Sequence, residues 1–151
     1  MRSSTVAIRE LGSSDRAAWD VLWAGYLEYY EHALEPAITE VVWRRLMDPA
    51  DQPYGLVAVD GEQIVGFVHY HFHLSTWSVA GYCYLEDLFV SPAARGKGAG
   101  RALIEAVYRA ADARGATRVY WHTDTSNTQA RALYDKIADL SPFVQYRRRT
   151  T

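Results

Sequence analysis

A glycine-rich turn at residues 95–100 has the composition of an anion-binding site. It reads Arg-Gly-Lys-Gly-Ala-Gly, and a segment with helical periodicity follows it. Glycine weakens helices, so three glycines at alternate positions of a helix start need a specific reason. The first N–H groups of a helix lack intrahelical partners, and the helix dipole adds positive charge there. Because glycine also lets a ligand approach the backbone, the turn is suited to a diphosphate.

The surroundings of the turn support this interpretation. Arg95, Lys97 and Arg101 add positive charge around it. A P-loop is excluded, because the pattern Gly-x-x-x-x-Gly-Lys-Ser/Thr is absent. The Gly-x-Gly-x-Gly spacing without an earlier βαβ unit is also a poor dinucleotide fingerprint. A glycine-rich helix entry on a surface loop, without any ligand, is the structural alternative.

The turn lies in a chain whose apolar residues alternate between strand and helix periodicity. An Asp60-Gly61 pair between two apolar runs predicts a hairpin, and Pro36 is expected to break the chain before the second helix. The predicted strands are 5–11, 54–60, 63–74, 81–90, 116–123 and 141–149, and the predicted helices are 15–32, 40–47, 98–114 and 127–140.

This order predicts an α+β fold in a single domain, residues 1–151. The second to fourth strands are consecutive and should pair antiparallel. The fourth strand, the third helix and the fifth strand form a right-handed crossover between parallel neighbours. We therefore expect one central mixed, mostly antiparallel sheet of about six to seven strands, with helices on both faces.

The turn and the strand before it resemble the GNAT superfamily of N-acetyltransferases. Arg95, Gly98 and Gly100 occupy the three fixed positions of the family signature Gln/Arg-x-x-Gly-x-Gly/Ala. The strand Tyr-Leu-Glu-Asp-Leu-Phe-Val, residues 84–90, resembles that of the spermidine/spermine and histone/polyamine acetyltransferase subgroup. One departure is the stretch after the last helix, which lacks the Gly-Phe that many relatives have there.

The resemblance implies acetyl-CoA as donor and no metal. A segment from Asn127 to Tyr134 resembles the Asn-x-x-Ala-x-x-x-Tyr stretch with which the family holds coenzyme A and protonates its leaving sulfur. Asn127 would hydrogen-bond the coenzyme arm, although it is also a plausible helix N-cap. Backbone groups of Leu88, Phe89 and Val90 would pair with the pantetheine arm. The diphosphate would contact Arg95, Gly96, Lys97, Gly98, Ala99, Gly100 and Arg101.

Acetyl transfer to an amine requires deprotonation of the amine, stabilisation of an oxyanion and protonation of the leaving thiolate. We expect Glu86 to be the general base, through water, and to contribute to substrate binding together with Asp87. Regular alternation would place these two on opposite faces, so a shared pocket requires a bulge. Tyr134 is the predicted general acid, since a phenol titrates near ~10 and a thiol near ~8.5. The alternatives are an arginine-paired Asp87 and a core Tyr134.

The resulting hypothesis is direct transfer of acetyl from acetyl-CoA to a primary amine in a ternary complex. The expected acceptor is a small polyamine, a diamine or an amino-acid-like amine. Acetylation of protein lysines or N-termini by the same site is one alternative, and a catalytically silent CoA-binding module is another. Relatives often dimerise, so the resemblance also implies a homodimer.

The composition of the chain narrows the classes of function and the cellular locations that we expect. The net charge of −2 over 151 residues gives no basic face for nucleic acid. The N-terminus has no signal-peptide pattern and no apolar run approaches the ~20 residues of a membrane span, so we expect a cytoplasmic protein without membrane contact. A single cysteine excludes an internal disulfide and any Cys-x-x-Cys metal site.

Two further sets of residues could do chemistry. His69, His71 and His73 alternate and share a strand face, so they form either a polar row in a cleft, which we favour, or zinc ligands. Cys83 could carry an acetyl group, but a lone cysteine in an apolar strand is more often a small buried hydrophobe.

Overall fold

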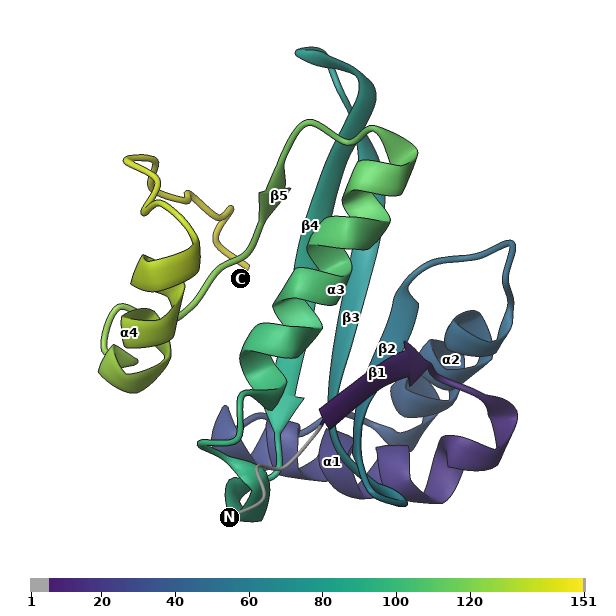
Figure 1. Ribbon diagram of the computed structural model, residues 1–151. Coiled ribbons are helices and arrows are strands. Elements are labelled where there is room, and N and C mark those ends of the chain that lie inside the picture. The colour runs from purple at the N-terminus through teal and green to yellow at the C-terminus, as the bar shows by residue number, and fades with distance from the viewer. Residues whose placement is uncertain (1–5, 151) are drawn as a thin grey trace. The chain divides into compact units, whose positions relative to one another are not determined.

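Figure 1 shows the computed structural model of the chain, in which residues 6–150 are described. Thr5, where the first strand is expected to begin, lies outside them. The chain divides into two compact units, one ending at Trp121 and the other beginning at His122. The first unit contains a five-stranded sheet in the order β1-β2-β3-β4-β5. Its strands are β1 (Val6–Glu10), β2 (Tyr54–Asp60), β3 (Gln63–Ser75), β4 (Ser78–Val90) and β5 (Val119–Tyr120).

The pairing confirms the predicted α+β fold with a mixed, mostly antiparallel sheet. Strands β1 to β4 pair antiparallel in sequence order, and β5 lies parallel to β4. The hairpin at Asp60-Gly61 is present, with Gly61 at a φ of +66°. The two longest strands, β3 and β4, have 13 residues each and form the hairpin that carries the site.

The prediction of six to seven strands is wrong for the described residues, because the strand expected at 141–149 is not formed. The segment contains Phe143, Val144 and Tyr146, residue types that are common in strands. Residue type alone does not make a strand, since the backbone N–H and C=O groups need a partner ladder. Within residues 122–150 the structure contains no other strand that could supply one.

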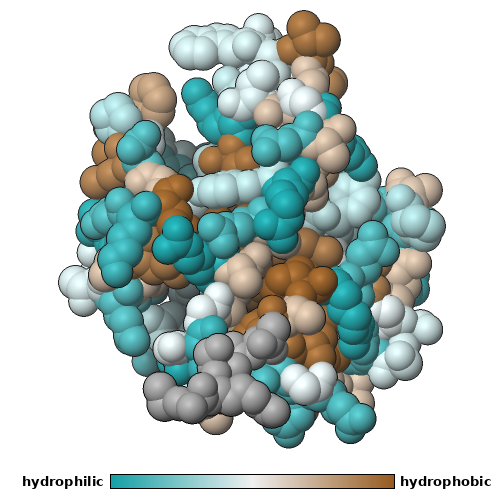
Figure 2. Space-filling view, viewed as in Figure 1, coloured by the Kyte–Doolittle hydropathy of each residue, from teal (hydrophilic) through white to brown (hydrophobic). Residues whose placement is uncertain are grey.

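Helices cover both faces of the sheet, as predicted (Figure 1). On one face lie α1 (Arg16–Tyr29) and α2 (Pro36–Met47), and on the other lies α3 (Ala99–Arg114). Figure 2 shows hydrophilic residues along the outward side of α3, whose inner side is apolar. The core beneath α1 and α2 consists of Trp19, Leu22, Trp23, Trp43, Val57, Phe67 and Phe89.

Pro36 begins the second helix instead of breaking the chain before it. A proline is tolerated at the first helical position, because the N–H group that it lacks would have no intrahelical partner there. The helix therefore starts four residues earlier than expected. Thr39 lies inside this helix, and its hydroxyl accepts a hydrogen bond from Trp23 Nε1 at 3.1 Å.

The second unit contains α4 (Thr128–Ile137). Asn127 caps this helix as predicted, with its Oδ1 accepting from the backbone N–H of Ala130 at 3.4 Å. Its amide also lies 3.4 Å from Thr123 Oγ1. Among the helices of residues 6–150, none combines the length and the apolar character that crossing a membrane requires.

Candidate active site

The two adjacent carboxylates lie at an irregularity in the pairing of β3 with β4. His69 pairs with Asp87, but the next residue of β3, Tyr70, pairs with Leu85. Glu86 is therefore an extra residue in β4. Such a β-bulge breaks the alternation of side chains and redirects the residues beside it. The bulge that a shared pocket requires is present.

Both carboxylates contact histidines of β3. Oε1 of Glu86 lies 2.5 Å from Nε2 of His71, and Oδ2 of Asp87 lies 3.0 Å from Nδ1 of His69. Two histidines two positions apart in a strand leave the same face. Glu86 and Asp87 therefore both reach the face of the sheet that α1 covers, and the structure brings together the two residues expected to bind and deprotonate an amine.

Asp87 also accepts a hydrogen bond from α1. The hydroxyl of Tyr26 donates to Oδ1 of Asp87 at 2.6 Å, so each carboxylate oxygen has a donor. Burial of Tyr26, together with the negative charge of Asp87, raises the pKa of the Tyr26 phenol well above its usual value. Tyr26 therefore stays protonated and acts as a donor to Asp87. The pairing of Asp87 with an arginine, considered as an alternative, is not what the structure shows.

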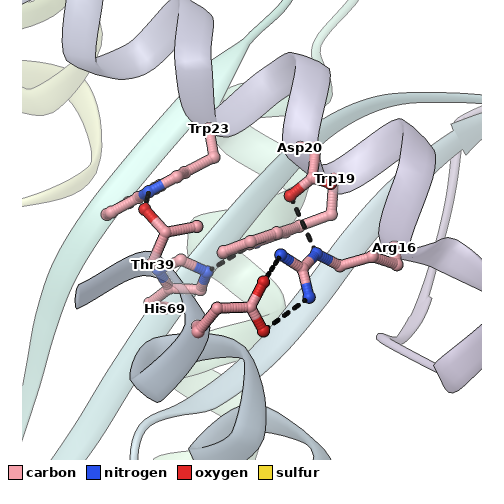
Figure 3. Close-up of polar contacts among 7 residues, drawn as sticks. Arg16, Trp19, Asp20, Trp23, Thr39 and His69 are labelled. Carbon is pink, nitrogen blue, oxygen red and sulfur yellow. Dashed lines mark hydrogen bonds and ion pairs between the residues drawn. The ribbon is translucent and has the colours of Figure 1, made fainter. Parts of the chain in front are cut away.

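His69 is held from its other side by a tryptophan of α1, as Figure 3 shows. The indole Nε1 of Trp19 donates to Nε2 of His69 at 3.1 Å. Both side chains are fully buried, with His69 only 1% exposed. An indole nitrogen can only donate, so Nε2 of His69 accepts and the ring proton lies on Nδ1, toward Asp87. The hydrogen-bonded series is therefore Trp19, His69, Asp87 and Tyr26.

Arg16 fixes the position of the tryptophans. Its Nε lies 2.9 Å from Asp20 and its Nη2 lies 2.5 Å from Glu40, so it links α1 to α2 (Figure 3). Its guanidinium also lies over the rings of Trp19 and Trp43, 5.9 and 5.4 Å from their centroids. These contacts hold Trp19 on the side of the helices, whereas its bond to His69 holds it on the side of the sheet.

The glycine-rich turn joins a short 3-10 turn, η2 (Pro92–Ala94), to α3. Gly96 and Gly98 have φ values of +86° and +82°, which side chains other than glycine rarely adopt. A Cβ placed on either would meet no atom within 4 Å, so the space beside both is open. Gly98 is the N-cap and offers no side-chain acceptor to the first N–H groups of α3. The turn therefore fits an external anion such as the diphosphate of coenzyme A.

The three basic residues at the turn are exposed, and a bound phosphate could take the place of their present contacts. Arg95 donates from Nε to the carbonyl of Val90 at 3.1 Å. Lys97 lies 3.4 Å from Asp60, and Arg101 lies 3.4 Å from Glu105. Exposed ion pairs of this length contribute little, so an incoming phosphate can compete for these cations.

The strand edge beside the turn is also suited to the coenzyme. Within residues 6–150, β5 pairs with β4 only at Cys83 and Tyr84. From Leu85 to Val90, β4 continues to pair with β3 on one side but no longer has β5 on the other. An amide-bearing pantetheine arm can satisfy backbone groups at such an edge. The geometry fits the expected role of Leu88, Phe89 and Val90.

Tyr134, the predicted general acid, lies half-buried on α4 of the second unit, as does its capping residue Asn127. The structure confirms the helix and the cap. The catalytic role of Tyr134 and the coenzyme contact of Asn127 stay predictions.

The remaining candidates have local partners. His73 contacts the Tyr120 hydroxyl at 2.7 Å through Nε2 and the Leu74 carbonyl at 2.8 Å through Nδ1. No set of three or more histidine, cysteine, aspartate or glutamate side chains suited to a metal occurs among the described residues. Cys83 is completely buried, and burial raises its thiol pKa to about 11, so it stays a thiol in the core.

Sequence reasoning missed Trp19 and Tyr26 as site residues. Tyr26 contacts Asp87, and Trp19 contacts His69. The predicted helix at residues 15–32 did not indicate which of its side chains would reach the strands. The histidine row was noticed, but one partner of His69, Trp19, comes from a helix fifty residues away in sequence.

Comparison with known proteins also indicates an acetyltransferase. A family model described as the acetyltransferase (GNAT) family matches residues 16–138. The D-amino-acid N-acetyltransferase HPA3 of Saccharomyces cerevisiae is 37% identical over 98% of this chain and 93% of its own. An uncharacterised N-acetyltransferase of Bacillus subtilis, YhfO, is 32% identical over 85% of this chain and 86% of its own.

A solved structure supports the fold independently. The ribosomal-protein-alanine N-acetyltransferase of Brucella melitensis biovar Abortus 2308 superposes with a TM-score of 0.81. The match covers 97% of this chain and 100% of that one at 23% identity, a level that speaks to fold alone.

Proposed function

The chain belongs to the GNAT family of acetyl-CoA-dependent N-acetyltransferases, and from this premise we propose that it acetylates the primary amine of a small amino-acid-like molecule by direct transfer. The observation that carries the proposal is the bulge in β4, which turns Glu86 and Asp87 to one face. The strand that holds them leads directly into the glycine-rich turn. The β3–β4 hairpin thus holds the carboxylates proposed to bind the amine, and the segment after β4 forms the turn proposed to bind acetyl-CoA.

The proposed roles follow from the chemistry of each group. Acetyl-CoA, when bound, supplies the acetyl group as a thioester. An amine is mostly protonated at neutral pH, since an ammonium titrates near ~10.4. Asp87 and Glu86 attract this cation, and Glu86, oriented by His71, takes one of its protons through water. Tyr134 gives its phenolic proton to the departing sulfur.

Two observations bear on the acceptor. The 37% identical yeast relative is named a D-amino-acid N-acetyltransferase, which favours an amino acid, and we place D-amino acids first. Two adjacent carboxylates would equally favour a diamine or polyamine, whose second ammonium needs its own partner. Polyamines are therefore the second candidate.

The test is release of free CoA when the protein is incubated with acetyl-CoA and a panel of amines. The panel contains D- and L-amino acids, diamines, polyamines and lysine peptides. We expect D-amino acids to give the highest kcat/KM. Preferred turnover of peptides would support protein acetylation instead, and coenzyme binding without turnover of any amine would indicate a silent module.

Glu86→Gln tests the proposed base. We expect kcat to fall by about 10² to 10⁴ with the coenzyme affinity retained. Glu62→Gln is the matched control, because Glu62 is an exposed residue at the β2–β3 turn. Equal activity of the two variants would remove Glu86 from the mechanism.

We also propose that the chain forms a homodimer. Leu140, Phe143, Val144 and Tyr146 are each at least 75% exposed in the single chain, and a second copy could cover them. Sedimentation of the wild type and of Phe143→Ser tests this. A monomeric wild type at micromolar concentration would contradict it.

A further inference from the structure

The bond between Trp19 and His69 has a consequence for the charge of the site. A neutral imidazole has one donor nitrogen and one acceptor nitrogen, and hydrogen-bond partners decide which is which. Trp19 donates to Nε2 at 3.1 Å, and Nδ1 lies 3.0 Å from a carboxylate oxygen of Asp87. Only one tautomer satisfies both contacts, the one with its proton on Nδ1.

The indole has little freedom to leave His69. Trp19 is 0% exposed and is stacked on Trp23, with centroids 5.5 Å apart and planes 9° apart. The ring of Trp43 packs on that of Trp19, with centroids 5.1 Å apart, and the guanidinium of Arg16 lies over the rings of Trp19 and Trp43. The indole N–H that faces His69 is therefore held in place by a buried aromatic cluster.

A second proton on His69 would have to sit on Nε2. There it would face the indole N–H, so two donors would oppose each other at hydrogen-bond distance. The charged group in contact with the ring is Asp87 from β4, and Tyr26 from α1 reaches it through Asp87. His71 of β3, with its partner Glu86, leaves the same face of the sheet. Around the ring, α2 contributes Trp43 through its contact with Trp19.

We propose that Trp19 is a positioning residue that keeps His69 neutral and thereby leaves the negative charge of Asp87 uncompensated for a cationic acceptor. Neither Tyr26 nor neutral His69 cancels that charge, although both orient the carboxylate by hydrogen bonds. A protonated His69 would form an ion pair with Asp87 and weaken the attraction for an ammonium. This role rests on the proposed function, in that the acceptor must be an amine.

The tautomer can be observed without any activity measurement. We would record long-range ¹H–¹⁵N spectra of the imidazoles in the uniformly labelled full chain from pH 8 to pH 6, using His69→Gln to assign the signals. Wild-type His69 should show a protonated Nδ1 and an unprotonated Nε2 throughout. In Trp19→Phe, Nε2 loses its donor, and the signal should change toward the doubly protonated form as the pH falls.

Trp23→Phe is the matched control. It removes another buried indole from the same stack, but the N–H it deletes bonds to Thr39 and not to His69 (Figure 3). Its His69 signals should keep the wild-type pattern. If wild-type His69 carries its proton on Nε2, or becomes doubly protonated over this range, the proposal is overturned whether or not Trp19→Phe folds.

Steady-state kinetics test whether the neutral His69 strengthens binding of the amine. Between pH 8 and pH 6 the amine KM of Trp19→Phe should rise roughly tenfold more than that of the wild type, with kcat changed less. Trp23→Phe should follow the wild-type profile. Parallel profiles for all three proteins would refute the role in amine binding. If the wild type acetylates no amine, the proposed function and this role fail together, while the spectra still decide the tautomer.

Discussion

Replacing Tyr26 by phenylalanine removes one hydrogen bond from Asp87 and little else. The hydroxyl donates to Oδ1 at 2.6 Å, and the carboxylate is only 15% exposed, so solvent replaces the bond poorly. A hydrogen bond to a charged group contributes about 1.5 to 3 kcal/mol. The ring contacts of residue 26 with Phe67 and Phe89 would remain. We expect Tyr26→Phe to lower the free energy of unfolding by about 2 kcal/mol, and Tm by about 4 to 8 °C.

A double-mutant cycle shows whether the charge of Asp87 is responsible. In an Asp87→Asn background the same change removes a neutral hydrogen bond, which is worth about 1 kcal/mol. The two losses, measured by denaturant unfolding, should therefore differ by about 1 kcal/mol. Tyr29→Phe, at a half-exposed position of the same helix, should change stability by less than about 0.5 kcal/mol. Losses that agree within about 0.5 kcal/mol in both backgrounds would refute the coupling.

Three further changes test other parts of the structure. Gly98→Ala and Gly61→Ala should cost similar stability, about 1 kcal/mol, because both sites have positive φ and open space, yet only Gly98→Ala should weaken CoA binding in calorimetry. The Arg9 guanidinium, 2.8 Å away, lowers the pKa of Asp15. The stabilisation from this ion pair is fully present at pH values above the usual pKa of an aspartate. It is lost as the pH falls through the lowered pKa of Asp15. Asp15→Asn should therefore cost about 1 to 2 kcal/mol at pH 7, discounted for a half-exposed arginine, and progressively less in urea unfolding at pH 3. Burial raises the pKa of Tyr70 to about 12. The unfolded chain loses that proton first, near pH 10, so Tyr70 alone lowers stability by about 1.4 kcal/mol per pH unit above it, and Tyr70→Phe should make the slope of the wild type shallower by that amount.

The elements of the proposed coenzyme-binding side, a strand, a turn and a helix, could be predicted because their signals are local. The turn chemistry of residues 95–100 and the helix periodicity after them depend on neighbours along the chain, and the structure reproduces the strand, the turn and the helix in order. The adjacency of Glu86 and Asp87 is likewise a property of the sequence. The hairpin at Asp60-Gly61 formed for the same local reason.

The arrangement of the residues proposed to bind the acceptor could be seen only in the folded structure. Whether Glu86 and Asp87 share a face was decided by the register of β4 against β3, which is a property of two strands together. One partner of His69, Trp19, lies fifty positions away in the sequence, and the other, Asp87, lies on the neighbouring strand, so no local pattern indicates either contact. The expected strand at 141–149 failed for a related reason, since a strand exists only where another strand pairs with it.

The amino-acid order of this protein by itself determined which groups carry chemistry and where the backbone turns, because side-chain type and local dihedral preference act over a few residues. Only the tertiary structure decided which of those groups meet and through which atoms. Those properties depend on burial and on partners from distant elements, and neither exists until the sheet and the helices have packed together.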